Sequence, residues 1–238
     1  MDVRHSRTRL IVPALPAAGE TLRLSREEAL HARARRLVAG DPVLLSDGSG
    51  AEGTGHVVRI SRKEMIVCVS EIVDRRPQEL RVKLYLAGLR PERLAWAVEK
   101  ATELGAAGVV LVRTARTQSF RASAGLLPRL ERIVRESSKQ CGRAEWPAIS
   151  GPVDFEQVLE DEHCRERLFL DADGARFPLR LDRESSALLV GPEGGWTDPE
   201  RTEASKRGWK IVALPTGTLR AETAAIAALA LVAAAAKR

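Results

Sequence analysis

Hydrophobic and polar residues follow two different patterns in the two parts of this 238-residue chain. In the first part, turns rich in Gly, Asp and Ser separate short β-prone runs at 10–12, 43–46, 55–60 and 65–69. A helical pattern covers 25–39, where Ser25 is the predicted N-cap and Glu28 completes a capping box. We predict a compact, partly open β-barrel with one helix.

The polar segment 73–79 contains a proline and marks a predicted domain boundary, after which strand and helix patterns alternate. Candidate strands lie at 82–87, 108–112, 167–170, 187–190 and 210–214. Candidate helices lie at 91–104, 128–140, 154–161, 198–207 and 221–236. Such alternation is typical of a mainly parallel α/β sheet. We therefore predict two domains, 1–75 and 76–238.

Composition is that of an ordinary globular protein, with 44% hydrophobic and 29% charged residues. The net charge is +6, and the window 113–143 alone holds eight basic and two acidic side chains. Such a basic strip attracts phosphate backbones, although a solvated helix face has the same composition. Charge alone therefore does not establish that the protein binds RNA.

Several classes of protein and site are not supported by the sequence. The three cysteines show no CxxC spacing and the four histidines are scattered, so we predict no metal site. An odd, unpaired cysteine count fits a reducing cytoplasm, and the N-terminus lacks the apolar core of a signal peptide. The apolar run 224–236 is shorter than the roughly 20 residues that span a bilayer. We expect a buried helix there, no membrane association and a cytoplasmic location.

Residues 48–53 match the GxGxxG pattern of dinucleotide-binding loops. That pattern binds a pyrophosphate only where a strand precedes the glycines and a helix follows them. A β-prone run at 55–60 follows here, so we interpret the segment as a hairpin turn.

Two glycine-containing loops follow predicted strands near the C-terminus. The strand 187–190 leads into GPEGGW at 191–196, and the strand 210–214 leads into PTGT and then LRAETA at 219–224. Ligands of α/β folds bind at the carboxyl ends of the strands, where both loops must lie. The alternatives are a plain turn for the first loop and, for Glu222, a carboxylate favoured by the helix dipole.

These motifs resemble those of the RsmE family, bacterial methyltransferases of the SPOUT (trefoil-knot) class that methylate N3 of a uridine in 16S ribosomal RNA. The likeness extends to EKATELG at 99–105, RTART at 113–117 and SSKQCGR at 137–143. Residues 31–48 resemble part of the family's PUA-like N-terminal domain. The resemblance implies a PUA-like RNA-binding β-barrel at 1–75 and a SPOUT α/β-knot methyltransferase domain at 76–238.

The resemblance also implies a site that holds S-adenosylmethionine between three loops. The implied cofactor-binding residues are Leu170, Val190, Gly191, Pro192, Gly194, Gly195, Leu214, Gly217 and Leu219. Arg220 is the first candidate for a cation that stabilises the uridine anion, and Glu193 or Glu222 is the candidate base. Arg116 and Arg143 would line the approach of the RNA.

The implied partners are a second copy of the chain, in a homodimer, and 16S rRNA within the small subunit or a late precursor. Two departures from the family pattern lie in the last loop, where Pro215 replaces a glycine and Gly217 replaces an arginine. Pro215 has no backbone N–H to donate, and Gly217 carries no charge. The departures leave open a non-catalytic RNA-binding or assembly factor. A methyltransferase with another RNA target is a further alternative.

Overall fold

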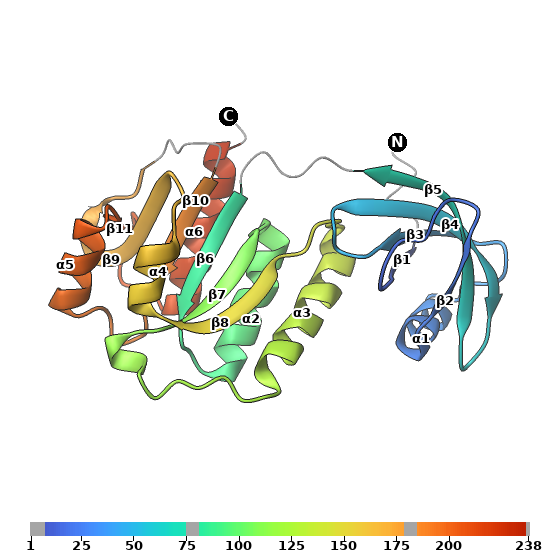
Figure 1. The fold of residues 1–238 in the computed structure, drawn as a ribbon, viewed down its shortest axis with the longest axis horizontal. Coiled ribbons are helices and arrows are strands. Elements are labelled where there is room, and N and C mark those ends of the chain that lie inside the picture. The colour runs from blue at the N-terminus through green and yellow to red at the C-terminus, as the bar shows by residue number, and fades with distance from the viewer. Residues whose placement is uncertain (1–7, 75–80, 179–184, 237–238) are drawn as a thin grey trace. The chain divides into compact units, whose positions relative to one another are not determined.

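The computed structural model describes residues 8–74, 81–178 and 185–236 (Figure 1). Contacts divide the chain into two compact units. The first comprises Met1–Pro77 and Ser138–Trp146, and the second comprises Gln78–Ser137 and Pro147–Arg238. The segment 138–146 therefore packs with the first unit, although it lies within the second domain of the sequence-based prediction.

The first unit is built on a curved five-stranded sheet with the strand order β1-β3-β4-β5-β2. Its elements are β1 (Thr8–Ile11), β2 (Thr21–Leu24), α1 (Arg26–Ala34), β3 (Pro42–Ser46), β4 (Ala51–Ile60) and β5 (Met65–Asp74). β1 runs parallel to β3, and the other pairs are antiparallel. The sheet forms a half-barrel with one helix, as the sequence predicts, but β2 is an additional strand. Gly48 and Gly50 lie in the turn of the β3–β4 hairpin and Gly53 lies in β4, paired with Leu45, which confirms the interpretation of 48–53 as a hairpin turn.

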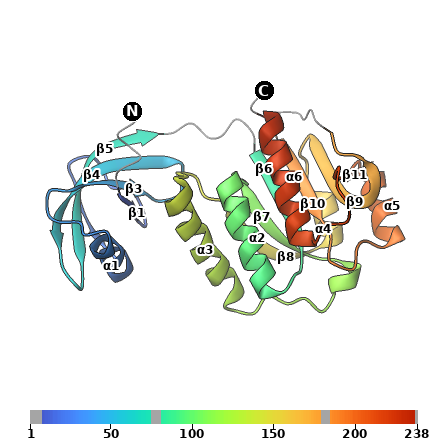
Figure 2. The ribbon, with the colours of Figure 1, turned by 180° about the vertical axis from the view of Figure 1, so that it is seen from behind.

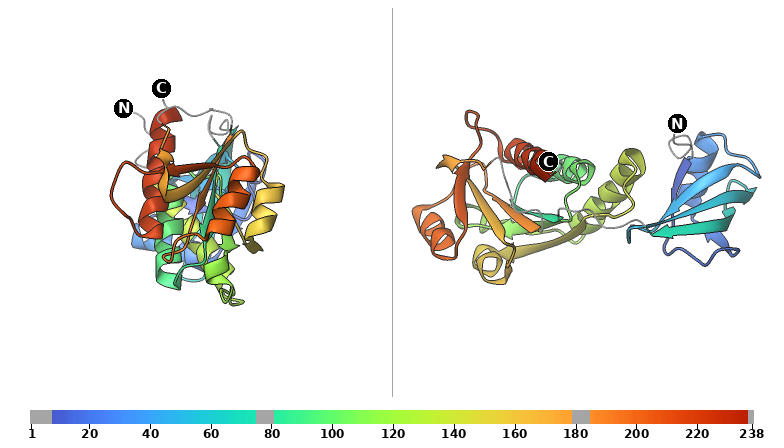
Figure 3. Two further views of the ribbon diagram at one scale, coloured as in Figure 1. Left: turned by 90° about the vertical axis from the view of Figure 1, so that its left-hand side faces the viewer. Right: turned by 90° about the horizontal axis from the view of Figure 1, so that it is seen from above.

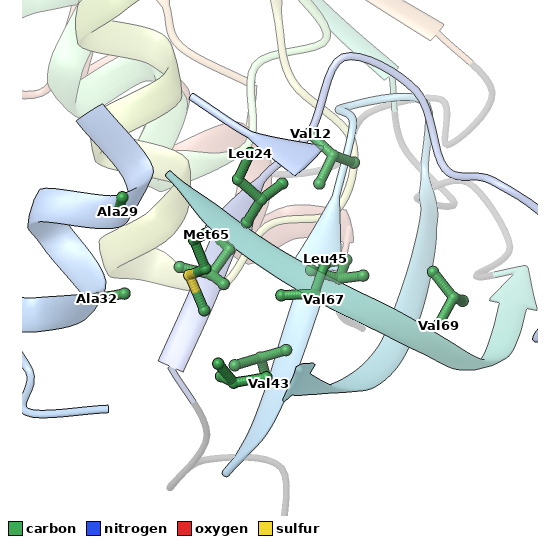
Figure 4. Packing of buried hydrophobic residues seen from close by; sticks show 11 residues of the cluster. Val12, Leu24, Ala29, Ala32, Val43, Leu45, Met65, Val67 and Val69 are labelled. Carbon is green, nitrogen blue, oxygen red and sulfur yellow. The ribbon is translucent and has the colours of Figure 1, made fainter. Parts of the chain in front are cut away.

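The core of the first unit lies between the sheet and α1 (Figure 4). Met65, Val67 and Val69 alternate along β5 with partly exposed residues, so one face of the strand is buried. Ala29 and Ala32 of α1 pack against this face, and their small side chains allow the helix to approach the sheet.

Helix α1 ends at Ala34, five residues before the predicted end. Its start is as predicted, because the Ser25 side chain accepts a hydrogen bond from the Glu28 N–H. The other half of the predicted capping box is not formed, because the Glu28 carboxylate accepts from Ile11 N–H and pairs with Lys139. Arg36 adopts a left-handed conformation, with a φ of 61°, and Leu37 N–H donates to the Ala32 carbonyl. The early end turns Leu37 back onto the core, where it packs against the buried cluster.

Polar contacts join the segment 138–146 to the rest of the first unit. Lys139 Nζ lies 2.6 Å from a carboxylate oxygen of Glu28, and both side chains are more than nine-tenths buried. Arg9 donates to the Gly142 carbonyl at 3.1 Å. Because these groups are removed from solvent, losing either partner leaves a buried polar group without compensation.

The second unit contains a six-stranded, wholly parallel sheet with the strand order β11-β9-β10-β6-β7-β8. Its strands are β6 (Arg81–Ala87), β7 (Gly108–Arg113), β8 (Ala148–Asp154), β9 (Glu166–Arg176), β10 (Ser185–Val190) and β11 (Lys210–Ala213). Its helices are α2 (Pro91–Leu104), α3 (Leu126–Cys141, shared with the first unit), α4 (Phe155–Asp161), α5 (Asp198–Lys206) and α6 (Ala221–Ala236). This confirms the predicted α/β class.

Helices cover both faces of this sheet. α2 and α6 pack together over one face, as Figure 2 shows, while α4 and α5 lie on the other, as the right-hand view of Figure 3 shows. The alanines of α6 allow close packing, and Ala225, Ala228 and Val232 are fully buried. Within the described parts of the chain, no helix combines the length and apolar character needed to cross a membrane.

Strand β8 is absent from the sequence-based prediction because its sequence, AISGPVD, contains adjacent Gly and Pro residues. Proline cannot donate to a ladder, so it is tolerated in edge strands and bulges. β8 is an edge strand, and its register with β7 shifts between Val110 and Val112. Its position therefore explains why a sequence that disfavours strands is extended here.

Glu162, which follows the last residue of α4, is a buried carboxylate that binds side chains of β6. Glu162 is 3% exposed and accepts hydrogen bonds from Tyr85 Oη at 2.6 Å, Lys83 Nζ at 3.0 Å and Cys164 N–H at 2.7 Å. Burial by itself raises the pKa of Glu162, but these hydrogen bonds outweigh it and lower the pKa to about 2.

We predict that Glu162→Ala lowers the free energy of unfolding by ~2–3 kcal/mol at pH 7, because Tyr85 Oη loses its buried acceptor. The ionised carboxyl stabilises the fold fully above its usual pKa of 4.5, and this contribution is lost as pH falls through about 2. The difference between variant and wild type should therefore shrink over that range. Urea unfolding followed by tryptophan fluorescence measures it, with Asp161→Asn at an exposed neighbouring position as the control. Equal stabilities of Glu162→Ala and wild type would contradict the prediction.

Candidate functional site

A cavity of about 500 Å³ lies in the second unit, beside the middle of β9 and the carboxyl ends of β10 and β11. The segment after Leu170, predicted to be a loop, is part of β9, and it lines the cavity together with the segments that follow β10 and β11 and with Arg201 of α5. The lining residues are Leu170, Asp171, Ala172, Asp173, Val190, Gly191, Pro192, Glu193, Gly195, Trp196, Arg201, Val212, Leu214, Thr216, Gly217, Thr218, Leu219, Ala221 and Ala224. Eight of the nine predicted cofactor-binding residues are among them, and Gly194 is not.

Trp196 joins the GPEGGW loop to the middle of β9. Its indole is 3% exposed and donates to the Leu170 carbonyl at 2.8 Å. The ring also packs against Phe169, with 4.3 Å between the ring centroids. Because both Trp196 and Leu170 line the cavity, this hydrogen bond connects two of its walls.

Two glycines of this loop are required by close packing or backbone geometry. A Cβ atom at Gly191 would lie 2.6 Å from Cε2 of Trp196. Gly195 closes a tight turn by donating to the Pro192 carbonyl at 2.9 Å, with a φ of +73° that favours glycine. A simple turn would require Gly195 alone, whereas Gly191 is required by the packing of Trp196 against the cavity wall.

Glu200 connects the residue that follows the GPEGGW loop to a segment near residue 115 by hydrogen bonds. One of its carboxylate oxygens accepts from the backbone and hydroxyl of Thr197, and the other accepts from Ala115 N–H at 2.8 Å. Ala115 begins the short 3-10 helix η2 (Ala115–Thr117), which carries Arg116. The Arg116 side chain lies against the loop, since a Cβ at Gly194 would be 3.2 Å from its Cδ.

The third wall, 214–219, contains both departures from the family pattern. Gly217 lines the cavity, and no atom lies within 4 Å of the position that a Cβ would take there. Pro215 is exposed and does not line the cavity. The missing backbone N–H at Pro215 therefore removes no hydrogen-bond donor from the residues that line the cavity.

Asp171 of β9 and Arg201 of α5 place opposite charges in the cavity lining. Asp171 accepts from Arg201 Nε at 2.7 Å and from Asp173 N–H at 3.0 Å. The hydrogen bond to Asp171 raises the pKa of Arg201. With Glu193, the lining has three carboxylates and one guanidinium, so its charge favours a ligand with cationic groups. Neither Asp171 nor Arg201 is among the site residues predicted from the sequence.

Of the three candidate catalytic residues, Glu193 alone lines the cavity. Glu193 lines the cavity and is about half exposed, while Arg220 is exposed at the start of α6 and does not line it. Glu222 lies outside the lining and is 7% exposed. Arg93 of α2 forms ion pairs with both Glu193 and Glu222, the latter with 3.7 Å between Nε and Oε1.

The predicted RNA-contacting arginines fall in different units. Arg116 belongs to the second unit and lies beside the cavity loop, as described above. Arg143 belongs to the first unit, where it is half-buried, and burial lowers its pKa. Among the described residues, no group of three His, Cys, Asp or Glu side chains is arranged to hold a metal ion.

The cavity has the size and chemistry of a cofactor site. Its volume lies within the roughly 300–1,000 Å³ of small-molecule pockets. Val190, Leu214 and Leu219 provide apolar surface for a flat ring, and the carboxylates suit cationic groups. These features fit a nucleoside-like ligand that carries positive charge.

Comparison with known proteins agrees with this geometry. Residues 76–233 match the family model of the RNA methyltransferase domain. Ribosomal RNA small subunit methyltransferase E of Synechocystis sp. is 31% identical over 210 residues, which cover 83% of this chain and 67% of that protein. The chain belongs to this family, RsmE. The Bacillus subtilis member is 27% identical over 88% of both chains.

Solved structures show the same relationship. A Legionella pneumophila protein in complex with the cofactor SAM is 28% identical, with a TM-score of 0.86 over 96% of this chain and 98% of that one. The RsmE protein of Neisseria gonorrhoeae, bound to S-adenosyl methionine, has a TM-score of 0.83 over 94% of this chain and 95% of that one. At 23% identity this second likeness establishes the fold.

We predict that Gly191→Ala lowers the melting temperature, because its Cβ collides with the buried Trp196 ring. Overpacking of this kind costs ~1–3 kcal/mol. Each kcal/mol shifts the melting temperature by about 2–4 °C in a protein of this size. Gly217→Ala is the matched control and should melt within 1 °C of wild type, because open space surrounds its Cβ position. Differential scanning calorimetry distinguishes the two variants, and equal melting temperatures would refute the packing argument.

Proposed function

We propose that this RsmE-family chain methylates N3 of a uridine in small-subunit (16S) ribosomal RNA, with S-adenosylmethionine as the methyl donor. The observation that carries the proposal is the three-walled cavity at the strand ends, within the region that matches the RNA methyltransferase family. The proteins of Synechocystis and Bacillus subtilis that share this family are named for methylation of small-subunit rRNA.

The cavity fits S-adenosylmethionine, the cofactor of the solved relatives. Leu214 and Leu219 would contact the adenine ring, and the glycine loop would allow close approach of the backbone to the ligand. Asp171, Asp173 and Glu193 offer carboxylates to its cationic sulfonium and ammonium groups. When bound, the cofactor supplies the methyl group.

The protein's own residues must handle the N3 proton of the uridine. N3 is only weakly acidic, so it requires a base, or a cation that stabilises the uridine anion. Glu193 is the better placed of the two candidate bases, because it lines the cavity and Glu222 does not. Arg220, beside the third wall, is the candidate cation. The target uridine must be unpaired or extruded, because N3 lies on its Watson–Crick edge.

The remaining assignments concern domains and partners. We propose that 76–238 forms the knotted SPOUT domain and that 1–75 acts as a PUA-like RNA-binding domain, which the half-barrel sheet supports. Arg116 and Arg143 would contact the 16S rRNA, in the small subunit or a late precursor. A homodimer is proposed from the family resemblance.

Two measurements test the function. Isothermal titration calorimetry should detect binding of S-adenosylmethionine to the purified chain. Nucleoside mapping of 16S rRNA from a strain that lacks the gene should show the loss of one N3-methyluridine, restored by complementation. Binding of rRNA without cofactor binding would instead support the assembly-factor alternative. Loss of a methyl group from another RNA would support a different target.

We predict that Arg220→Ala binds S-adenosylmethionine within about threefold of wild type, because Arg220 does not line the cavity. Its turnover should fall at least about a hundredfold, because removal of a group that stabilises an anionic transition state has effects of this size. Methyl transfer from labelled cofactor to 16S rRNA measures the turnover. Lys206→Ala, which removes an exposed cation on α5, is the control and should retain full activity. A fully active Arg220→Ala enzyme would remove Arg220 from the mechanism.

A further inference from the structure

Arg93 contacts two segments that are distant from it in the sequence. It lies in the first turn of α2, and its guanidinium forms an ion pair with Glu193 of the GPEGGW loop and a second with Glu222 of α6. The Arg93 side chain is 27% exposed. One cation therefore links the loop that forms a cavity wall to the N-terminal turn of the last helix.

The electrostatics make Arg93 more than a surface residue. Glu222 is 7% exposed, and its Oε2 has no hydrogen-bond partner among the described residues. A buried carboxylate of this kind is costly unless a cation lies beside it. The first turn of a helix disfavours cations, so the position of Arg93 on α2 is unfavourable for the helix alone. Its two carboxylate partners compensate for this cost.

We propose that Arg93 is a positioning residue for the cofactor site. Its two ion pairs, which we call the clasp, hold the GPEGGW loop against the start of α6 and so stabilise the cavity wall. Arg93 itself does not line the cavity, and it acts through Glu193, which does. The effect on cofactor affinity rests on the proposed function, whereas the effect on loop order does not.

Hydrogen–deuterium exchange of the amides at 191–196 tests the clasp without any cofactor. In Arg93→Ala the loop loses its anchor and the two carboxylates repel each other, so these amides should exchange about tenfold faster. The amides of 65–69 in the first unit serve as the internal reference and should not change. Unchanged exchange at 191–196 in Arg93→Ala would overturn the proposal.

Calorimetric titration with S-adenosylmethionine tests the consequence for the site. We expect Arg93→Ala to raise the Kd about tenfold, and Arg93→Lys, which keeps the charge, to recover most of the affinity. Arg90→Ala is the matched control, because Arg90 is the exposed N-cap residue of the same helix and has no ion pair within the described structure. Arg90→Ala should bind as wild type does.

A second variant covers the case in which Arg93→Ala unfolds. Glu193→Gln breaks the same ion pair from its half-exposed end, where no buried charge is left unpaired. It should loosen the loop as Arg93→Ala does, and the double variant should exchange no faster than either single variant. Additive effects on exchange would mean that the two residues act separately, and would overturn the clasp. If wild type binds no cofactor, the proposed function fails while the exchange experiment still decides the clasp.

Discussion

The parallel direction of all six strands in the second unit is the constraint on which the site depends. Leu170, Val190 and Leu86 are register partners across β9, β10 and β6, so these strands reach the same edge of the sheet. Residues 170–173 of β9 and the loops that follow β10 and β11 then lie side by side around the cavity, although over forty residues of chain separate the first segment from the last. A reversal of any one strand would carry its loop to the opposite edge. The cavity is thus a product of topology, and the loop sequences adapt it to a ligand.

Buried polar contacts hold these neighbouring loops at fixed distances. Trp196 connects the second wall to the middle of β9, Glu200 connects η2 to the start of α5, and Arg93 connects the second wall to α6. Each contact joins segments remote in sequence. The contacts of Trp196 and Glu200 are buried, where water competes poorly, so they are stronger than comparable surface contacts. Arg93 contacts the buried Glu222 as well as the half-exposed Glu193. The backbone around the cavity therefore owes its order to a few side chains, of which Trp196 belongs to the lining and Glu200 and Arg93 do not, while most of the lining is small or apolar.

Much of this arrangement was predictable from the sequence, for identifiable physical reasons. α2 and α6 were predicted to the residue, since Pro91 marks the first turn of α2, Gly105 ends it with a φ of 88°, and α6 is a continuous apolar run. β8 was missed because it contains Gly151 and Pro152, which only an edge position tolerates. The two glycine loops could be read as cavity walls, but Arg93 and Asp171 could not, because their roles depend on which elements pack together. A cation in the first turn of α2 was the one local signal that Arg93 has acidic partners elsewhere.

The path of the chain between the two units limits how such a protein can be divided. The chain leaves the first unit near residue 77, returns for 138–146, and then leaves again. A fragment that stops at the first crossing lacks the lysine that neutralises Glu28 and the carbonyl that accepts from Arg9. Neither unit is therefore a continuous piece of sequence that a single cut could release intact. Recombination that exchanged one unit for another would need two junctions, and inheritance of both units together is the simpler evolutionary outcome.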